Sequence, residues 1–285
     1  MADLQTVKKL KELAYRQRVK LIELCGSYEG PVHIGGDLSM TDVLVALYHY
    51  GMRVDPNDIT MPGRDRFILS KGHAAVCMYI AMALRGFFDL DDIFKTYAQL
   101  DSAYGMHPCK VQLPGVETSS GSLGHGLSLA CGMALMARQR KENYRIFCMM
   151  GDGESCEGSV WEAAMLAGSY KLGNIVGVVD RNHQFMTQFS ETGPMNLEPY
   201  ADKWRAFGWN VISVNGHDMA QIVDAIDALP PADSETPTLI LAETVKGKGV
   251  PFMERNLAWH AGKLSEENMR EALAEMASAY ERGDL

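Results

Sequence analysis

The sequence predicts an α/β fold: a doubly wound, mainly parallel sheet with helices on both faces. Short apolar runs that fit buried strands alternate with longer segments of helical spacing, and this alternation repeats along the chain. Such a pattern implies right-handed crossovers between parallel strands. A length of 285 residues favours one large domain, so we expect residues 1–285 to form a single domain.

The expected elements follow in order along the chain. Apolar residues at helical spacing predict an opening helix over 4–24, and a second helix near 39–47 begins where Ser39 to Asp42 resembles a capping box. Apolar runs predict strands at 67–69, 146–150, 175–179, 211–214 and 238–242. Further helices are expected through 78–84 after a turn at Gly72, and at 123–140, 159–170, 200–207, 219–229 and 265–281, with long loops at 55–65 and 100–121.

Composition excludes several classes of protein. The net charge of −9 argues against a general nucleic-acid or anionic-membrane surface, because phosphates are repelled at long range. The first residues carry charges every few positions and no apolar run reaches about 18 residues, so we expect a cytoplasmic protein without a membrane span. The six cysteines show no C-x-x-C pair and no zinc-like spacing, which predicts neither disulfides nor structural zinc.

The sharpest local signal is GDGESCEG at 151–158, which directly follows an apolar strand. Asn182 ends the next strand, thirty residues after Asp152. Because the carboxyl ends of neighbouring parallel strands lie side by side, these two residues are expected to converge on one cation. Mg²⁺ accepts a few protein oxygens together with ligand phosphates, and glycines at 151 and 153 would let a diphosphate approach the backbone.

GDG alone is a weak motif, because a Gly-Asp-Gly sequence can also be a surface turn. The preceding strand and the following Asn182 favour the binding site. With these residues in view, the chain resembles the transketolase family, whose thiamine diphosphate fingerprint is GDG followed about thirty residues later by Asn. The matching segments stand in the family's order: VHIGG from Val32, RDRFILSKGH ending at His73, GVETSSGSLGHG at 115–126, GDG with Trp161-Glu162-Ala163, and KGKGVPFMERNLAWH ending at His260.

The resemblance implies the thiamine diphosphate-binding fold and assigns cofactor and metal ligands. Asp152 and Asn182, with the backbone carbonyl of Gln184, would hold Mg²⁺, or another divalent cation such as Ca²⁺ or Mn²⁺, on the cofactor's diphosphate. His73 and His260 would donate hydrogen bonds to that diphosphate. The remaining cofactor-binding residues that the resemblance implies are Gly151 and Gly153 at the diphosphate and Gly121, Ser122 and Leu123 at the aminopyrimidine.

The resemblance also assigns catalytic roles. His33 and His260 would face the reacting carbon and handle its proton, and His107 would bind the hydroxyl on the first carbon of the donor. Glu157 and Glu162 would lie at the subunit interface and link two active sites. From the residues alone, a solvated first helical turn is the favoured interpretation for both glutamates, and a structural or surface position is the favoured one for any single histidine.

One required group is missing from the sequence. Thiamine chemistry needs a carboxylic acid at N1′ of the aminopyrimidine, and in this family that glutamate belongs to a second domain, for which we find no second set of apolar strands. The resemblance therefore implies a split enzyme that needs a separate C-terminal transketolase subunit, in an α2β2 assembly. Together the two chains would transfer a two-carbon ketol unit from a ketose phosphate to an aldose phosphate.

Three positions depart from the family's usual pattern. Asp37 stands where serine is common, His125 where glutamine is common, and the sequence HQFMTQF follows Asn182. Because His125 and the segment Phe185 to Gln188 are expected to border the cofactor and substrate channel, an unusual ketose phosphate, branched or otherwise modified, is a hypothesis for the substrate.

Two other interpretations remain open. The chain fits a subunit of a 2-oxo acid decarboxylase or dehydrogenase, which shares GDG, although the histidine segments favour ketol transfer. It also fits a non-catalytic phosphate- or nucleotide-binding α/β module, in which GDG is a general anion-binding turn. Thiamine diphosphate binding that requires Mg²⁺ distinguishes the enzymes from the module.

Overall fold

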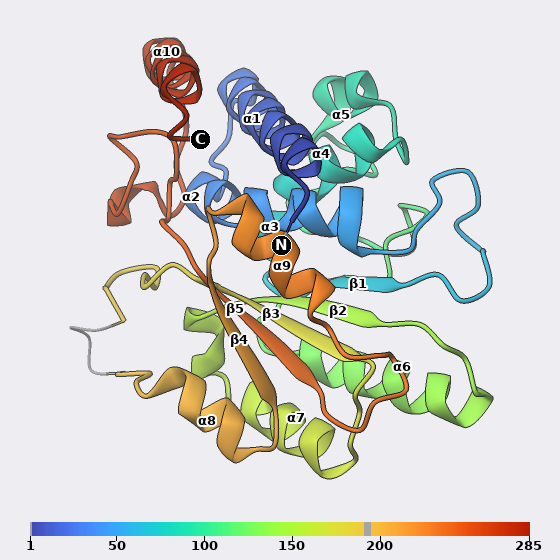
Figure 1. The fold of residues 1–285 in the computed structure, drawn as a ribbon. Coiled ribbons are helices and arrows are strands. Elements are labelled where there is room, and N and C mark those ends of the chain that lie inside the picture. The colour runs from blue at the N-terminus through green and yellow to red at the C-terminus, as the bar shows by residue number, and fades with distance from the viewer. Residues whose placement is uncertain (1, 191–194) are drawn as a thin grey trace.

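One parallel sheet forms the centre of the molecule (Figure 1). The computed structural model describes residues 2–190 and 195–285, and within these ranges the sheet has five strands in the spatial order β1-β2-β3-β5-β4. Their bounds are β1 Arg66–Leu69, β2 Ile146–Gly151, β3 Ile175–Arg181, β4 Asn210–Asn215 and β5 Thr238–Glu243. Every paired strand runs parallel to its neighbour, which confirms the predicted α/β class.

Helices cover both faces of the sheet (Figure 1). On one face lie α1 Leu4–Ser27, α3 Thr41–Ala46, α4 Ala75–Arg85 and α9 Met219–Asp227, while α10 Glu266–Arg282 packs against α1. On the other face lie α6 Gly126–Arg140, α7 Gly158–Ser169 and α8 Tyr200–Ala206.

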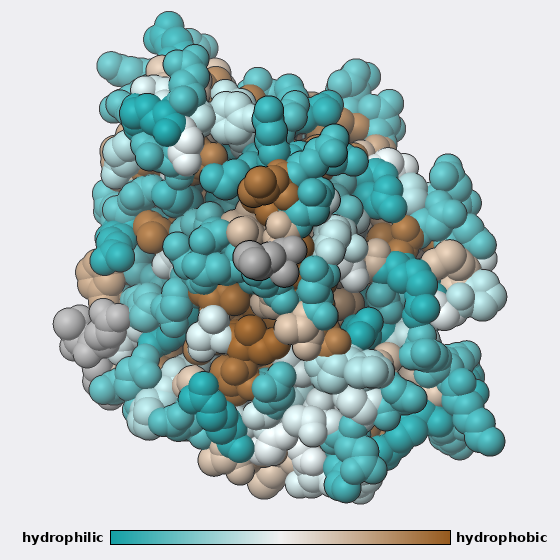
Figure 2. Space-filling model, viewed as in Figure 1, coloured by the Kyte–Doolittle hydropathy of each residue, from teal (hydrophilic) through white to brown (hydrophobic). Residues whose placement is uncertain are grey.

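Alternate side chains of each strand enter two separate cores, because successive residues of a strand point to opposite faces. In β2, Phe147 and Met149 pack with α1, α3 and α4, whereas Cys148 and Met150 pack with α6 and α7. This double burial explains why the central strands read as continuous apolar runs. At the edge of the sheet, β4 is only partly buried, and Figure 2 shows hydrophobic residues gathered over this part of an otherwise mainly hydrophilic face.

Two local predictions near the amino terminus need correction. The helix expected near 39–47 is preceded by a short helix, α2 Ile34–Ser39, and the residue before α3 is Met40, which makes no side-chain cap. The Ser39 hydroxyl instead donates to the carboxylate of Asp180 at 2.6 Å, so the capping-box interpretation was wrong. A helix that was not predicted, α5 Leu90–Thr96, follows Asp89, whose carboxylate caps its first turn.

The carboxyl ends of the strands meet along one edge of the sheet. Gly151 of β2 is in register with Asp180 of β3, and Asp180 is in register with Ala242 of β5. Residues that follow these strands are therefore neighbours, although Asp152 and Thr244 are far apart along the chain. Ligands of open parallel sheets bind at this edge.

Two further observations concern the cysteines and helices that could span a membrane. The six cysteines all lie within the described residues and all are free. No helix in the described part of the chain combines the length and apolar character needed to cross a membrane.

Candidate functional site

A cavity of about 340 Å³ lies at the carboxyl edge of the sheet. Most of the predicted site residues line it, and they come from every part of the chain. The lining includes His33, His73, His107, His260, Gly121, Leu123, Gly151, Asp152, Gly153, Asn182 and Gln184. It also includes residues that the sequence analysis did not single out, among them Gly36, Lys71, Glu154 and Lys246.

The four histidines expected at the site lie close together. The ring of His33 is 5.2 Å from that of His73, 5.5 Å from that of His260 and 6.5 Å from that of His107, centroid to centroid. His73 and His260 are 5.8 Å apart. The four rings come from separate segments at the cavity, so only the folded chain brings them together.

The environment keeps three of these histidines neutral near neutral pH. Burial lowers the pKa of His73 to about 2 and that of His260 to about 4, with Lys71 adding to the effect at His73 and Lys246 at His260. Burial and then His107 lower the pKa of His33. A neutral imidazole carries one N–H donor and one acceptor nitrogen, so these rings can donate to an anion and also move protons.

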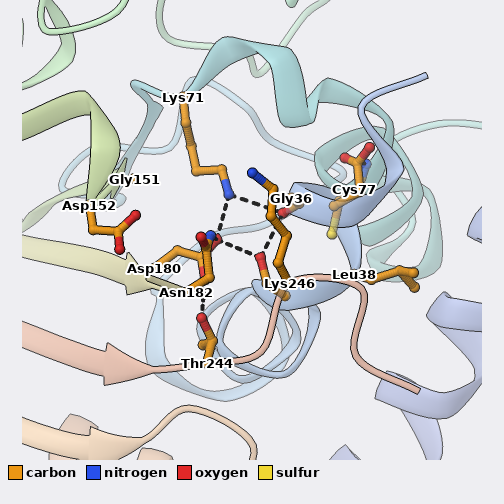
Figure 3. Close-up of polar contacts among 12 residues, drawn as sticks. Gly36, Leu38, Lys71, Cys77, Gly151, Asp152, Asp180, Asn182, Thr244 and Lys246 are labelled. Carbon is orange, nitrogen blue, oxygen red and sulfur yellow. Dashed lines mark hydrogen bonds and ion pairs between the residues drawn. The ribbon is translucent and has the colours of Figure 1, made fainter. Parts of the chain in front are cut away.

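Lys71 is the first functional residue that the sequence analysis missed. Its ammonium donates to the Asp180 carboxylate at 2.6 Å and to the Gly36 carbonyl at 3.0 Å (Figure 3). Ser39, Asn182 and Thr244 also donate to Asp180. Burial would raise the pKa of Asp180, but the adjacent Lys71 and these hydrogen bonds hold it below its ordinary value. The result is a fully buried, hydrogen-bonded ion pair beneath the cavity.

Lys246 supplies a second cation from the loop after β5. Its Nζ lies 2.7 Å from Nδ1 of His260. Burial, with Lys71 adding to it, lowers the pKa of Lys246 to about 8, so the amine remains mostly protonated at neutral pH. An ammonium can only donate, so Nδ1 of His260 accepts this bond and Nε2 carries the ring proton.

Asp152 and Asn182 converge as predicted at the ends of β2 and β3. Figure 3 shows the Asp152 side chain pointing toward Asp180 and Asn182. The Asp152 carboxylate accepts from Arg181 at 3.0 Å and from the backbone N–H of Gly153 and His183, each at 2.8 Å. Burial raises the pKa of Asp152, although the neighbouring Arg181 guanidinium opposes this shift.

The residues fit a diphosphate with a divalent cation. One carboxylate, one amide oxygen and a backbone carbonyl form a hard-oxygen donor set, which suits Mg²⁺ when phosphate oxygens complete it. Within residues 2–190 and 195–285 there is no cluster of three or more His, Cys, Asp or Glu side chains that could bind a metal ion. Gln184 is one of the residues that line the cavity, and neither of its buried side-chain amide atoms has a hydrogen-bond partner in the described residues.

The glycines of the lining leave room for such a ligand. A Cβ atom at Gly36 would lie 3.4 Å from the Lys71 ammonium, and a Cβ at Gly151 would meet nothing closer than 4.0 Å. Side chains at these two positions would therefore occupy space in the cavity beside the Lys71 side chain. At position 153 a side chain would meet the protein itself, because a Cβ there would lie 2.7 Å from Cδ1 of Phe185. A side chain at 153 would therefore force the Phe185 ring to shift.

Glu154 is another residue that the sequence analysis missed. Its carboxylate accepts from the backbone N–H of Gly124 at 2.8 Å and of Gly151 at 3.0 Å, and from the Ser70 hydroxyl. Burial raises its pKa, while these hydrogen bonds lower it in part. Glu154 thereby ties the loop before α6 to the end of β2. The letter E after GDG was visible in the sequence, but two of its partners, Gly124 and Ser70, are distant in the chain.

Several predicted residues lie outside the cavity lining. Ser122 is exposed, as are Glu157 and Glu162 at the start and on the first turns of α7. His125 is exposed just before α6 and is not part of the cavity lining, so its expected place at the border of the channel stays a prediction. Asp37 is fully buried and accepts from the Cys77 N–H at 3.0 Å.

The segment after Asn182 was expected to border the channel, and two of its residues do. Phe185 and Met186 line the cavity beside Gln184. The Phe185 N–H donates to the Gln188 carbonyl at 2.8 Å, which closes a tight turn. The departure from the usual family pattern therefore lies at the wall of the site.

Comparison with known proteins agrees with this geometry. The family "Transketolase, thiamine diphosphate binding domain" matches residues 14–280. An apulose-4-phosphate transketolase subunit of Phocaeicola vulgatus is 38% identical over 276 residues, which cover 97% of this chain and 96% of that protein. The 6-deoxy-6-sulfo-D-fructose transketolase subunit SqwG of a Clostridium species is 41% identical over 248 residues, covering 87% and 89%.

A solved structure shows the same fold. The transketolase of Campylobacter jejuni superposes with a TM-score of 0.84 at 28% identity, over 97% of this chain and 43% of that one. The chain thus spans less than half of that transketolase, whereas it spans nearly all of the two subunit-type relatives. This chain belongs to the transketolase family, of which it carries the thiamine diphosphate binding domain.

Proposed function

We propose that this chain is the cofactor-binding subunit of a two-chain transketolase. With a partner chain it would transfer a two-carbon ketol unit from a ketose phosphate to an aldose phosphate. The observation that carries the proposal is the convergence of four histidines, two lysines and the Asp152–Asn182 pair on one cavity. Four histidines at the site favour ketol transfer over oxidation or decarboxylation of a 2-oxo acid, because sugar hydroxyls need several donors and acceptors.

The end of the cavity near β2 and β3 would hold the cofactor's diphosphate. Asp152, Asn182 and the Gln184 carbonyl would bind Mg²⁺, or Ca²⁺ or Mn²⁺ in its place. Lys71, Lys246 and the N–H of His73 would neutralise and bind the phosphate oxygens. Thiamine diphosphate, when bound, supplies the carbon nucleophile that breaks and forms the carbon–carbon bond.

The other histidines would act on the sugar. Because Lys246 donates to Nδ1 of His260, the Nε2–H of His260 is free to donate into the cavity. His33 is held neutral and lies 5.5 Å from His260, which places two proton donors or acceptors at one point of the site. His107 is more exposed, and it would bind a hydroxyl of the donor sugar at the cavity mouth.

A partner chain would have to supply the carboxylic acid that thiamine chemistry needs at N1′ of the aminopyrimidine. Among the described residues that line the cavity, the carboxylates are Asp152 and Glu154. Both already accept backbone N–H groups, so neither is placed to protonate an aminopyrimidine. The two relatives are named as subunits, which supports a partner chain for this protein too, and we propose an α2β2 assembly. Glu157 and Glu162 would then lie at the contact between subunits.

The substrate we propose is a branched or otherwise modified ketose. The relatives are named for apulose 4-phosphate and for 6-deoxy-6-sulfofructose, which are both unusual sugars. Phe185 and Met186 form the part of the cavity wall where this chain departs from the usual family pattern. Because Phe185 also packs against Gly153, these side chains lie toward the diphosphate end of the cavity, and the names of the relatives carry the substrate proposal.

The test is to co-express this chain with its partner and to assay ketol transfer with and without thiamine diphosphate and Mg²⁺. Donors would include xylulose 5-phosphate, a branched ketose phosphate and a 6-sulfo ketose. We expect transfer by the pair only, dependent on both cofactors, with a modified donor used best. Full turnover by the single chain would refute the split enzyme, and equal or better use of xylulose 5-phosphate would refute the proposed substrate.

A further inference from the structure

A buried chain of polar groups lies behind the cavity and is not explained by the proposed chemistry. Arg18 of α1 forms a bidentate ion pair with Asp42 of α3, with one N–O distance of 2.8 Å. Oδ2 of Asp42 lies 2.8 Å from Nδ1 of His217, in the loop after β4. On the other side of the ring, Nε2 of His217 lies 2.8 Å from the backbone nitrogen of Val245. The chain thus connects two helices to the loop after β5.

The hydrogen bonds fix the form of the His217 ring. A backbone N–H can only donate, so Nε2 of His217 accepts from Val245 and carries no proton. The ring proton is therefore on Nδ1 and is donated to the Asp42 carboxylate. The Arg18 guanidinium keeps Asp42 ionised: burial would raise the pKa of Asp42, but Arg18 lowers it far below its ordinary value. An ionised Asp42 holds the imidazole in one orientation, as carboxylates do for metal-binding histidines.

The hydrogen bond from Val245 to His217 lies between two residues, Thr244 and Lys246, that make contacts at the site. Thr244, one residue earlier, donates to Asp180, the partner of Lys71. Lys246, one residue later, reaches His260. A Cβ at Gly216 would lie 2.5 Å from Cγ2 of Thr244, so the loop that carries His217 packs directly on this segment. The orientation of the Val245 peptide therefore sets where the Lys246 side chain starts.

We propose that His217 is a positioning residue: with Asp42 and Arg18 it holds the backbone at Val245 so that the Lys246 ammonium reaches the anion-binding end of the cavity. The role rests on the proposed function, because it assumes that Lys246 binds a diphosphate. His217 itself does not line the cavity and would touch neither cofactor nor substrate.

A double-mutant cycle tests this role with inorganic pyrophosphate and Mg²⁺ as the probe, measured by calorimetry on the full chain. Lys246→Met and His217→Phe are each expected to weaken binding by about tenfold, which is the scale of one lost charged or buried hydrogen bond. In the double variant we expect no further loss, since His217 acts through Lys246. His217→Gln retains one acceptor and one donor, and it should restore most of the affinity.

Hydrogen exchange of the Val245 amide gives a readout without ligand. We expect it to exchange at least about tenfold faster in His217→Phe and at the wild-type rate in Lys246→Met. His49→Phe is the matched control, because His49 is also partly buried but lies outside the cavity lining. It should change neither the affinity nor the exchange of Val245.

The outcomes separate the two proposals. Additive losses of pyrophosphate affinity in the double-mutant cycle would overturn the positioning role, and so would an unchanged exchange rate of Val245 in His217→Phe. In either case, binding of pyrophosphate by the wild-type chain leaves the proposed function intact. A wild-type chain that does not bind pyrophosphate with Mg²⁺ would refute the proposed anion site, and the positioning role with it.

Discussion

The two lysines of the cavity are held in different ways. Lys71 forms a fully buried ion pair with Asp180, which also accepts three other donors. Lys246 makes its close contact with the neutral ring of His260. Loss of a partner from a buried pair leaves an uncompensated charge, which is costly, whereas an ammonium beside an imidazole leaves no such charge behind. The two positions should therefore differ in how much they contribute to stability.

The first prediction concerns Lys71. The substitution Lys71→Met leaves the Asp180 carboxylate buried without a counter-charge, and we expect it to lower the free energy of unfolding by about 3–5 kcal/mol. Lys171→Met is the matched control, because Lys171 pairs with Glu235 on the surface and such pairs contribute at most about 1 kcal/mol. Urea unfolding followed by circular dichroism measures both. Equal losses in the two variants would contradict the interpretation.

The second prediction follows from the pKa of His73, which burial lowers to about 2 from an ordinary value of 6.5. Below pH 6.5 the unfolded chain binds a proton at this residue and the folded chain does not, so stability is lost as pH falls. Each pH unit corresponds to about 1.4 kcal/mol, which gives about 2 kcal/mol between pH 6.5 and 5. The substitution His73→Gln removes this proton-binding group. The variant should therefore lose less stability than the wild-type chain between pH 6.5 and 5.

Urea unfolding of the ligand-free chain at pH 7.5 and at pH 5 measures the difference. His125→Gln serves as the control, because His125 is exposed and lies outside the cavity. It should follow the wild-type chain at both pH values. A His73→Gln variant that loses as much stability as the wild type would show that His73 is not the group responsible.

The sequence predicted the site histidines but not the lysine beside them. Lys71 stands two residues before His73 in a motif segment, yet a lysine in a polar turn reads as a solvated side chain. What holds it at the cavity is its partner Asp180, which is 109 positions away and lies near the end of β3. Such a pairing depends on strand order, which local spacing does not specify. Glu154 was missed for the same reason.

At the scale of elements, the apolar strands and the longer helices were predicted correctly, because their periodic patterns are strong over many residues. The short elements were not. Helix α5 has seven residues and a single buried side chain, Ile93, so its pattern is too weak to detect. The sequence from Ser39 to Asp42 has the letters of a capping box, but a buried carboxylate at Asp180 competes for the Ser39 hydroxyl.

The third prediction concerns the outer face of α6 and α7, where large apolar side chains are exposed. They are Leu129, Met136, Met165, Leu166 and Tyr170. Helices α6 and α7 pack side by side, and Glu162 lies one turn before Leu166 on α7. Exposed apolar side chains grouped on adjacent helices mark association surfaces. We therefore expect Met165→Glu to weaken association of the proposed subunits by at least tenfold.

Size-exclusion chromatography with light scattering on the co-expressed pair measures this association. Leu4→Glu is the control, because Leu4 is also exposed and apolar but lies at the start of α1, on the other side of the sheet. It should leave the assembly unchanged. Wild-type association by the Met165→Glu variant would place the contact between subunits elsewhere.

At the scale of the whole molecule, all five strand ends contribute to the site or to its support. Lys71 follows β1, Asp152 follows β2, Asn182 follows β3, His217 follows β4 and Lys246 follows β5. The alternation of strands and helices was sufficient to predict that such residues would share one edge. It did not predict the strand order, which decides that β5 lies between β3 and β4. That residues 1–285 form one domain stays a prediction.

The last prediction uses this convergence, because a ligand held by several strand ends stabilises the entire fold. A ligand at one hundred times its dissociation constant stabilises the folded chain by about 2.7 kcal/mol. We expect thiamine diphosphate with Mg²⁺ to raise the melting temperature by several degrees, and either one alone to have much less effect. Asp152→Asn should abolish this shift, since the cation loses its carboxylate ligand, and differential scanning fluorimetry measures it.

The matched control is Asp202→Asn, which changes an exposed carboxylate on α8 that pairs with Arg205 on the surface. It should retain the full shift. Arg181 keeps Glu198 as a partner when Asp152 is neutral, so the Asp152→Asn chain is expected to fold and to give a readable transition. A shift of wild-type size in Asp152→Asn would mean that the ligand binds without a cation at this carboxylate. Stabilisation by a nucleotide, with none by thiamine diphosphate, would instead favour a phosphate-binding module over the proposed enzyme.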